Sequence, residues 1–371
     1  MTKPLMNTGP MIRIFILLVS LQANMLAAQD YELETVAEGF SYPWCVAFMP
    51  EGQFIMSMRS GELRIVEADG QIGEPISGVP SAYVESQGGF FDVVLDPQFE
   101  SNQLIYLAYA DGSIEENATN IVQARLVDNA LQDLRSIFRV SPTKRGPAHY
   151  GGKLVFLSDE TLLLSTGDGF DYRESAQDPF SQLGKIVRMN RDGSVPADNP
   201  FADGKNGDPL VWSYGHRSPQ GLDYDAATGT VYMHEHGPLG GDEVNIVQAG
   251  ANYGWPAITY GINYSGAYVS PFTKAEGMQQ PIHYWVPSIA PSGMAYYNSD
   301  AFPAWKNSLF VGALVDKEVR RLSLKGGQII AEETLFAELD ARIRDIRVGP
   351  DGLLYVLTDS ETGKLVRIKP R

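Results

Sequence analysis

The stretch from 234 to 256, HEHGPLGGDEVNIVQAGANYGWP, places an irregular backbone beside two adjacent carboxylates, Asp242 and Glu243. Proline lacks an N–H group and glycine favours positive φ, so a helix cannot run through Gly237-Pro238. These residues are equally unsuited to the interior of a strand. The stretch therefore combines backbone outside regular secondary structure with two neighbouring carboxylates.

A second group of polar residues is spread over the rest of the chain: Gln87, His149, Asp168, Arg217, Ser218, Arg342 and Arg344. Each has an ordinary structural explanation when taken alone. Asp168, between two glycines, could cap a turn, and an Arg-x-Arg pair on an edge strand could serve to block aggregation. Arg342 and Arg344 stand at alternate positions, so an extended strand would point both side chains to the same face.

A sequence pattern that recurs six times predicts the elements that position these residues. Each copy has a short apolar strand, a turn with Pro, Asp, Asn or Gly, and a second apolar strand. The copies span residues 44–66, 88–110, 149–169, 218–238, 291–314 and 342–359. Their spacing of roughly 60 residues is that of a four-stranded propeller blade. The sequence therefore predicts an all-β, six-bladed β-propeller of antiparallel blades; six unrelated hairpins in a large sandwich are the alternative.

In a propeller, the residues that open or close each copy should meet at one mouth of the central channel. All seven polar residues stand at or beside such positions. Three arginines and a glutamine around one mouth favour an anionic, planar ligand with several carboxylates. The overall formal charge of −16 argues against nucleic acid or an anionic membrane as a partner.

The N-terminus predicts export. Arg13 precedes the apolar run 14–21, and small residues at 27–28 precede Gln29, which is typical of a secretory signal peptide. The apolar run is too short to span a bilayer comfortably, and no later stretch predicts a membrane helix. We expect residues 1–28 to be a signal peptide and residues 29–371 to form one propeller domain, with a soluble, periplasmic mature protein. The oligomeric state stays open between monomer and homodimer.

Five motifs in order then identify a resemblance: HYGGKLVF, STGDG, WSYGHRSPQGL, the 234–256 stretch and RIRD. Together they resemble the soluble pyrroloquinoline quinone (PQQ)-dependent aldose sugar dehydrogenases, periplasmic six-bladed propellers related to soluble glucose dehydrogenase. The resemblance covers the chain from about the first blade to the C-terminus. It implies oxidation of aldoses to lactones by hydride transfer to calcium-bound PQQ, with electrons passed to an unidentified acceptor.

The resemblance also implies roles for individual residues. His149 matches the general base, Asp168 the acid that holds its imidazole, and Arg217 the arginine that reaches the reactive quinone carbonyl. His149 and Arg217 also match cofactor-binding positions, and the further matches of this kind are Gln87, Ser218, Lys317, Arg342 and Arg344. Ser218 stands where the family commonly has Asn, and the match at Lys317 in the fifth blade is poor. Ala148 replaces an Asp of glucose dehydrogenase, which favours the broader aldose group.

Two calcium sites follow from the same resemblance. One ion would lie between the cofactor and the carbonyls of Gly237 and Pro238. The other would be structural, with Glu243 and the carbonyl of Tyr253 as ligands. A calcium-dependent propeller hydrolase of the lactonase type is the alternative, disfavoured by the arginine-rich mouth. The second alternative is a non-catalytic propeller that binds protein or glycan. Such a protein would have no reason to contain a His–Asp pair together with Arg217.

Overall fold

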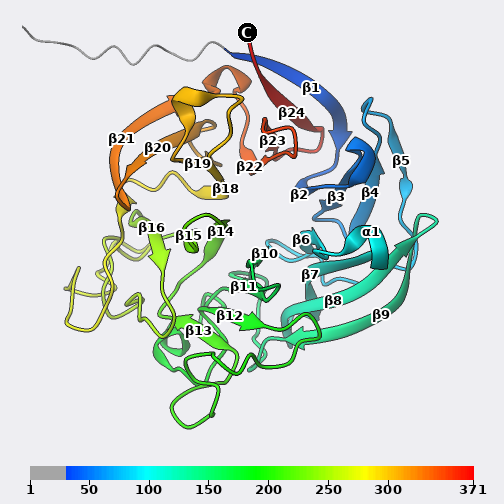
Figure 1. Ribbon diagram of the computed structural model, residues 1–371. Helices are drawn as coiled ribbons and strands as arrows, with labels where there is room; N and C mark the ends of the chain where they lie inside the picture. The colour runs from blue at the N-terminus through cyan, green and yellow to red at the C-terminus, as the bar shows by residue number, and fades with distance from the viewer. Residues whose placement is uncertain (1–30) are drawn as a thin grey trace, which may run out of the picture.

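Six four-stranded antiparallel sheets surround a central axis in the computed structural model, which describes residues 31–371 (Figure 1). The all-β six-bladed propeller predicted from the sequence is confirmed. The predicted signal peptide, residues 1–28, lies outside the described residues. Among residues 31–371, no helix has the length and hydrophobicity that a bilayer crossing needs.

The blades follow one another along the chain, with the first strand of each nearest the axis (Figure 1). The first blade has β2 (Pro43–Phe48), β3 (Phe54–Met58), β4 (Glu62–Val66) and β5 (Ile72–Pro75). The second has β6 (Phe90–Leu95), β7 (Leu104–Gly112), β8 (Asn117–Val127) and β9 (Ala130–Arg139). The third has β10 (Gly151–Phe156), β11 (Leu162–Thr166), β12 (Lys185–Met189) and β13 (Val211–Tyr214).

The remaining three blades repeat this order. The fourth has β14 (Pro219–Asp225), β15 (Thr230–Glu235), β16 (Asp242–Val247) and β17 (His283–Trp285). The fifth has β18 (Pro291–Tyr297), β19 (Ser308–Ala313), β20 (Val319–Lys325) and β21 (Gln328–Leu335). The sixth has β22 (Ile343–Val348), β23 (Leu354–Thr358), β24 (Gly363–Pro370) and β1 (Tyr31–Phe40). Five of the six recurring patterns of the sequence thus form the first two strands of a blade, and the first, residues 44–66, also includes the third strand, β4.

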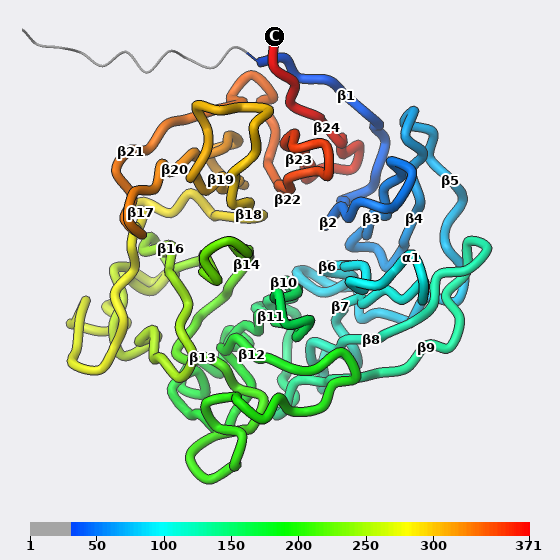
Figure 2. Tube along the Cα trace, in the orientation of Figure 1, coloured from blue at the N-terminus to red at the C-terminus, as the bar shows by residue number. Residues whose placement is uncertain are grey.

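The ring closes where the two ends of the described chain meet. β1 is the outermost strand of the sixth blade and pairs antiparallel with β24, with Thr35 opposite Val366 (Figure 2). Because β1 comes from the N-terminal side and β22 to β24 from the C-terminal side, backbone hydrogen bonds tie the first blade to the last.

Helical segments occur only as single turns in the described residues. They are α1 (Phe99–Asn102) and the 3-10 turns Pro50–Gly52, Arg173–Gln177, Pro303–Trp305 and Ala337–Leu339. The turns between the first two strands of four blades share a different device, in which an Asp carboxylate accepts a hydrogen bond from the backbone N–H two residues later. These carboxylates belong to Asp96, Asp159, Asp225 and Asp351.

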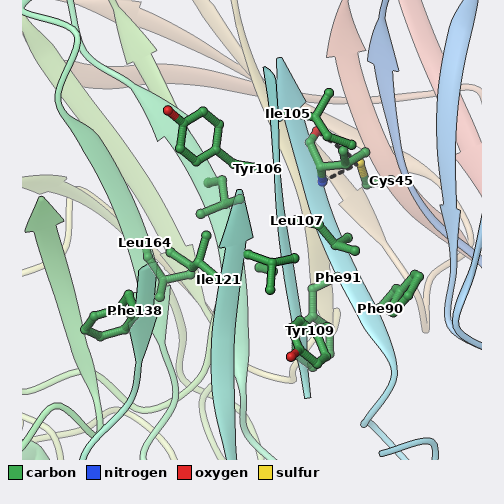
Figure 3. Packing of buried hydrophobic residues seen from close by; sticks show 14 of the residues in the cluster. Cys45, Phe90, Phe91, Ile105, Tyr106, Leu107, Tyr109, Ile121, Phe138 and Leu164 are labelled. Atoms are coloured by element: carbon green, nitrogen blue, oxygen red, sulfur yellow. Dashed lines mark hydrogen bonds between the residues drawn. The ribbon is translucent and has the colours of Figure 1, made fainter. Parts of the chain in front are cut away.

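Apolar side chains fill the space between neighbouring blades. Ile105 and Leu107 of β7 are buried with Ile121 of β8 and Leu164 of β11 in one cluster (Figure 3). The only cysteine, Cys45, is fully buried there, and its Sγ accepts a hydrogen bond from the backbone N–H of Val93 at 3.3 Å. This interblade packing fixes the innermost strands, whose ends carry the site.

Charged groups cross the axis between three innermost strands, β6, β10 and β22. Asp345 receives Lys153 Nζ at 2.6 Å and Arg347 Nε at 2.9 Å. Arg347 also pairs with Asp92 at 2.7 Å. Both carboxylates are fully buried, so each needs its cation to offset the cost of desolvation.

Candidate active site

One cavity of about 420 Å³ opens on the axis, at the end where the innermost strands begin. Every blade contributes to its wall. The predicted residues that line it are Gln87, His149, Arg217, Ser218, Arg342 and Arg344. Positions separated by more than 250 residues in the chain therefore meet at one mouth, as the repeat pattern predicts.

His149 is placed by unusual backbone. It has φ 54°, and Gln87 Oε1 accepts a hydrogen bond from its N–H at 2.8 Å. A Cβ on Gly167 would lie 2.3 Å from the His149 carbonyl oxygen, so only glycine lets the end of β11 approach this closely. That approach brings Asp168 against the imidazole: Nδ1 of His149 lies 2.6 Å from Asp168 Oδ1.

Asp168 lies behind His149 and is fully buried. Its Oδ1 also accepts the backbone N–H of Phe170 at 2.8 Å, and its Oδ2 accepts Trp255 Nε1–H at 2.8 Å. Burial alone would raise the pKa of Asp168, but the hydrogen bond and charge of His149, together with Arg217, lower it overall. The carboxyl is therefore ionised at neutral pH, and it fixes the imidazole with the proton on Nδ1.

The imidazole itself is held neutral. Burial lowers the pKa of His149, and the charges of Arg217 and Lys144 lower it further against the opposing effect of Asp168. With Nδ1 turned to Asp168, Nε2 has no hydrogen-bond partner in the described part of the chain. A neutral imidazole with an unpaired nitrogen at a cavity wall can take a proton from a bound ligand.

Arg217 joins the cavity to the irregular turn at 236–241. Its Nη1 donates to the carbonyl oxygens of Gly237 at 2.6 Å and His236 at 3.1 Å, and its guanidinium lies over Trp255 at 5.3 Å. Its own N–H donates to Glu235. Arg217 is almost fully buried, so the guanidinium has one orientation and a ligand need not order it.

The two arginines of the sixth blade reach the same cavity, as their alternate spacing predicts. Asp359 Oδ2 accepts a hydrogen bond from Arg342 Nε at 3.0 Å and from Arg344 Nη2 at 3.3 Å. Burial lowers the pKa of Arg344, an effect that Asp359 opposes. Ser218 also lines the wall, with its side chain outside any hydrogen bond of the described residues.

Lys317 is not brought into this cavity. It follows the turn after β19 with φ 57°, and its ammonium group pairs with Asp340 at 3.0 Å in an exposed position. Val315, two residues earlier, lines the cavity instead. Within the connection from β19 to β20, the cavity contact expected at Lys317 is therefore made by Val315, while Lys317 pairs with Asp340.

The residues expected to bind calcium surround the Gly237-Pro238 turn. Gly237 and Glu243 line a small cavity of about 10 Å³ next to the main one, together with Glu235 and Tyr253. Burial raises the pKa of Glu243 to about 8, and the charge of Glu235 adds to this effect. The carbonyls of Pro238 and Tyr253 accept no hydrogen bond within residues 31–371.

Asp242, the neighbour of Glu243, has a structural role in the same turn. Its Oδ1 accepts the N–H of Gly237 at 2.9 Å, and its Oδ2 accepts from Ser288 Oγ at 2.6 Å and Ile289 N–H at 2.9 Å. These bonds hold the irregular backbone in place. The described residues contain no group of three or more His, Cys, Asp or Glu side chains arranged to hold a metal ion.

Sequence reasoning missed several residues that line the main cavity: Tyr42, Trp44, Arg59, His236, Tyr264 and Asp359. His236 stands two positions after His234, and alternation along the strand could have placed both on the axis side. Burial lowers the pKa of His236 to about 3, and its Nε2 lies 2.5 Å from the Pro291 carbonyl. Tyr264 belongs to the long connection after β16, which carries no repeat signal.

The candidate active site is therefore a cavity on the propeller axis, lined by four arginines and by the buried His149, which Asp168 holds from behind. The chain belongs to the Glucose / Sorbosone dehydrogenase family, whose pattern matches residues 40–367. It is therefore an oxidoreductase of that family.

Known relatives match over almost the whole chain. Aldose sugar dehydrogenase YliI of Escherichia coli is 41% identical over 362 residues, covering 95% of this chain and 97% of that protein. The crystal structure of soluble aldose sugar dehydrogenase from Escherichia coli in the apo-form superposes with a TM-score of 0.88 at 40% identity, covering 92% and 100% of the two chains. The PQQ-bound aldose sugar dehydrogenase of Streptomyces coelicolor superposes with a TM-score of 0.77 at 26% identity, covering 92% and 98%.

Proposed function

We propose that this chain oxidises aldose sugars at the anomeric carbon to lactones, with PQQ as the electron-accepting cofactor and His149 as the general base. The observation that carries the proposal is that His149, paired with the buried Asp168 behind it, lines the same cavity as Arg217, Arg342 and Arg344. PQQ-dependent relatives of the same fold support the cofactor.

The cavity fits a planar tricarboxylate. Four arginines line it against one carboxylate, Asp359, so its wall is strongly cationic in a chain of net charge −16. Arg342 and Arg344 would grip cofactor carboxylates, with Gln87 and Ser218 as polar contacts. When bound, PQQ supplies the site that accepts hydride from the sugar.

His149 would remove the proton of the anomeric hydroxyl through Nε2. Loss of hydride from the anomeric carbon requires removal of this proton, and a neutral imidazole can accept it near neutral pH. Asp168 would hold the ring in the productive tautomer and stabilise the imidazolium that forms. Both functions follow from its position on Nδ1 and from its lowered pKa.

Arg217 would stabilise the negative charge that develops on the quinone carbonyl. Its guanidinium is already oriented by the Gly237 and His236 carbonyls and by Trp255. A fixed hydrogen-bond donor at a water-poor site typically stabilises the transition state by about 3–4 kcal/mol, because it needs no reorganisation during the reaction.

The residues of the turn fit calcium. Glu243 lies beside Glu235, and its low solvation together with that charge raises its pKa to about 8, so a cation bound between the two would favour the ionised carboxylate. With the unpaired carbonyl of Tyr253 it would hold a structural calcium ion. The Pro238 carbonyl and that of Gly237, which also accepts from Arg217 Nη1 at 2.6 Å, would hold a second ion at the cofactor. Calcium there would help Arg217 to polarise the quinone carbonyl.

The cellular setting follows from the sequence. We propose export to the periplasm by the signal peptide at residues 1–28, and transfer of electrons to an acceptor that neither sequence nor fold identifies. The substrate would be a small aldose, and Ala148 beside His149 favours a range broader than glucose.

A titration of purified apoprotein tests this function. PQQ and calcium are added, and the quinone absorption is followed before and after an aldose is supplied. The expected result is a shifted absorption that the aldose bleaches and that a chelator prevents. An unchanged spectrum on adding PQQ and calcium would overturn the proposal. A panel of aldoses with a dye acceptor would then define the substrate range.

A further inference from the structure

Arg59 is a cation on the cavity wall for which the protein supplies no anion. It follows β3 in the first blade, and its guanidinium forms no ion pair and no hydrogen bond among residues 31–371. Its one close partner is the ring of Tyr42, whose centroid lies 4.5 Å from the guanidinium carbon. The five N–H donors of the Arg59 guanidinium therefore have no hydrogen-bond acceptor among the described residues, although the residue lines the cavity.

The position of Arg59 is fixed by the closure of the ring. Its backbone N–H donates to the Tyr42 carbonyl at 3.0 Å, and the Tyr42 N–H donates to the Ser360 carbonyl at 2.8 Å. Ser360 follows Asp359, which holds Arg342 and Arg344. Arg59 is thus tied to the same edge of the sixth blade as the two arginines that the sequence already assigned to carboxylates.

The charges at this end of the cavity do not balance. Arg59, Arg342 and Arg344 line this end of the cavity with one carboxylate, that of Asp359, which pairs only with Arg342 and Arg344. Their mutual repulsion is felt at Arg344, whose pKa is lowered by burial and, in addition, by the charges of Arg342 and Arg59. Clustered like charges without counterions lower stability, and they are retained at sites that bind a charged ligand.

We propose that Arg59, stacked on Tyr42, is a third arginine of the cofactor clamp and binds a carboxylate of PQQ. This inference rests on the proposed function. A neutral sugar offers no group that needs a third guanidinium, whereas a tricarboxylate does. The stacked guanidinium is pre-oriented, so it can donate two parallel hydrogen bonds to one carboxylate.

Equilibrium binding of PQQ to apoprotein tests the inference by isothermal titration calorimetry in calcium-containing buffer. Arg59→Gln should raise the Kd for PQQ about ten- to hundredfold, the effect of losing hydrogen bonds to a charged group. Arg59→Lys keeps the positive charge but loses the parallel N–H donors of the guanidinium. Its Kd should therefore lie between those of the wild type and Arg59→Gln. Tyr42→Ala should weaken binding less than Arg59→Gln, because it removes only the platform.

Arg145→Gln is the matched control. Arg145 is an exposed arginine in the loop before β10, it pairs with Glu115, and it does not line the cavity. Its loss should leave the Kd for PQQ unchanged. Thermal unfolding of the apoproteins separates a binding role from a structural one: Arg59→Gln should keep or raise the Tm, since it relieves repulsion from Arg344.

A Kd for Arg59→Gln within twofold of the wild-type value overturns the inference, as does a lowered Tm of the apoprotein with unchanged PQQ binding. An effect confined to the KM of acidic sugars also overturns it, because it assigns Arg59 to substrate. If the wild-type protein itself does not bind PQQ, the proposed function fails. That result differs from equal PQQ binding by the wild type and Arg59→Gln, which overturns only the role of Arg59.

Discussion

Replacement of Asp168 by Asn separates the charge of this residue from its shape. All three partners of the Asp168 carboxylate are donors: His149 Nδ1–H, the Phe170 N–H and Trp255 Nε1–H. An amide has one oxygen, so its NH₂ group must face a donor on one side. The oxygen satisfies two donors if it occupies the Oδ1 position, which leaves Nδ2 against Trp255.

We expect a large loss of rate, because Asn places no negative charge beside the His149 imidazolium that forms in the reaction. We expect kcat of Asp168→Asn to fall roughly 10²- to 10⁴-fold, the range for loss of an effective general base. The Asp168 carboxylate raises the pKa of His149. Its removal should therefore lower that pKa further, so the acidic limb of kcat/KM moves to lower pH while the plateau falls.

The assay is reduction of a dye by an aldose with PQQ and calcium at saturation. Trp255→Phe serves as the partner in a double-mutant cycle, because it removes the donor that faces the new NH₂ group. If the loss came only from this donor clash, Trp255→Phe would restore most of the rate in the Asp168→Asn background. Such a rescue, or an Asp168→Asn rate within threefold of the wild type, would refute the role given to the carboxylate.

Three further predictions use other parts of the structure. His149→Ala should abolish turnover and leave the Kd for PQQ nearly unchanged, since the imidazole acts on the substrate hydroxyl; a near wild-type rate in the dye assay contradicts this. Arg344→Ala should raise the PQQ concentration that gives half activity at least about tenfold. Lys317→Ala should not raise it, because Lys317 lies outside the cavity and pairs with Asp340. Equal effects of the two substitutions would contradict the assignment of Arg344 to the cavity. Asp345→Ala should lower the free energy of unfolding by about 3–5 kcal/mol, because it leaves the buried Lys153 without a carboxylate and takes from Arg347 one of its two carboxylate partners. Asp300→Ala, on the surface, should change the free energy of unfolding by less than about 0.5 kcal/mol. Chemical denaturation that gives similar values for both variants would refute the axial network.

The sequence alone determined the architecture because the signal for a blade is local. Alternating apolar strands joined by short turns with Asp, Asn, Gly or Pro can be read from about twenty consecutive residues, and repetition of that pattern predicts the ring. The short motifs around His149, Arg217 and Gly237 could be read in the same way. Gly167 and the Gly237-Pro238 turn are visible because their residue types restrict the backbone.

Only the tertiary structure decided which side chains share the cavity outside these motifs. Arg59, His236 and Asp359 reach it because the second strands of their blades end at the mouth where the innermost strands begin, whereas Lys317 pairs with Asp340 outside the cavity. The pairing of β1 with β24 likewise joins residues more than 300 positions apart. Such contacts depend on the sum of many blade-to-blade packing interactions, and no local pattern encodes that sum.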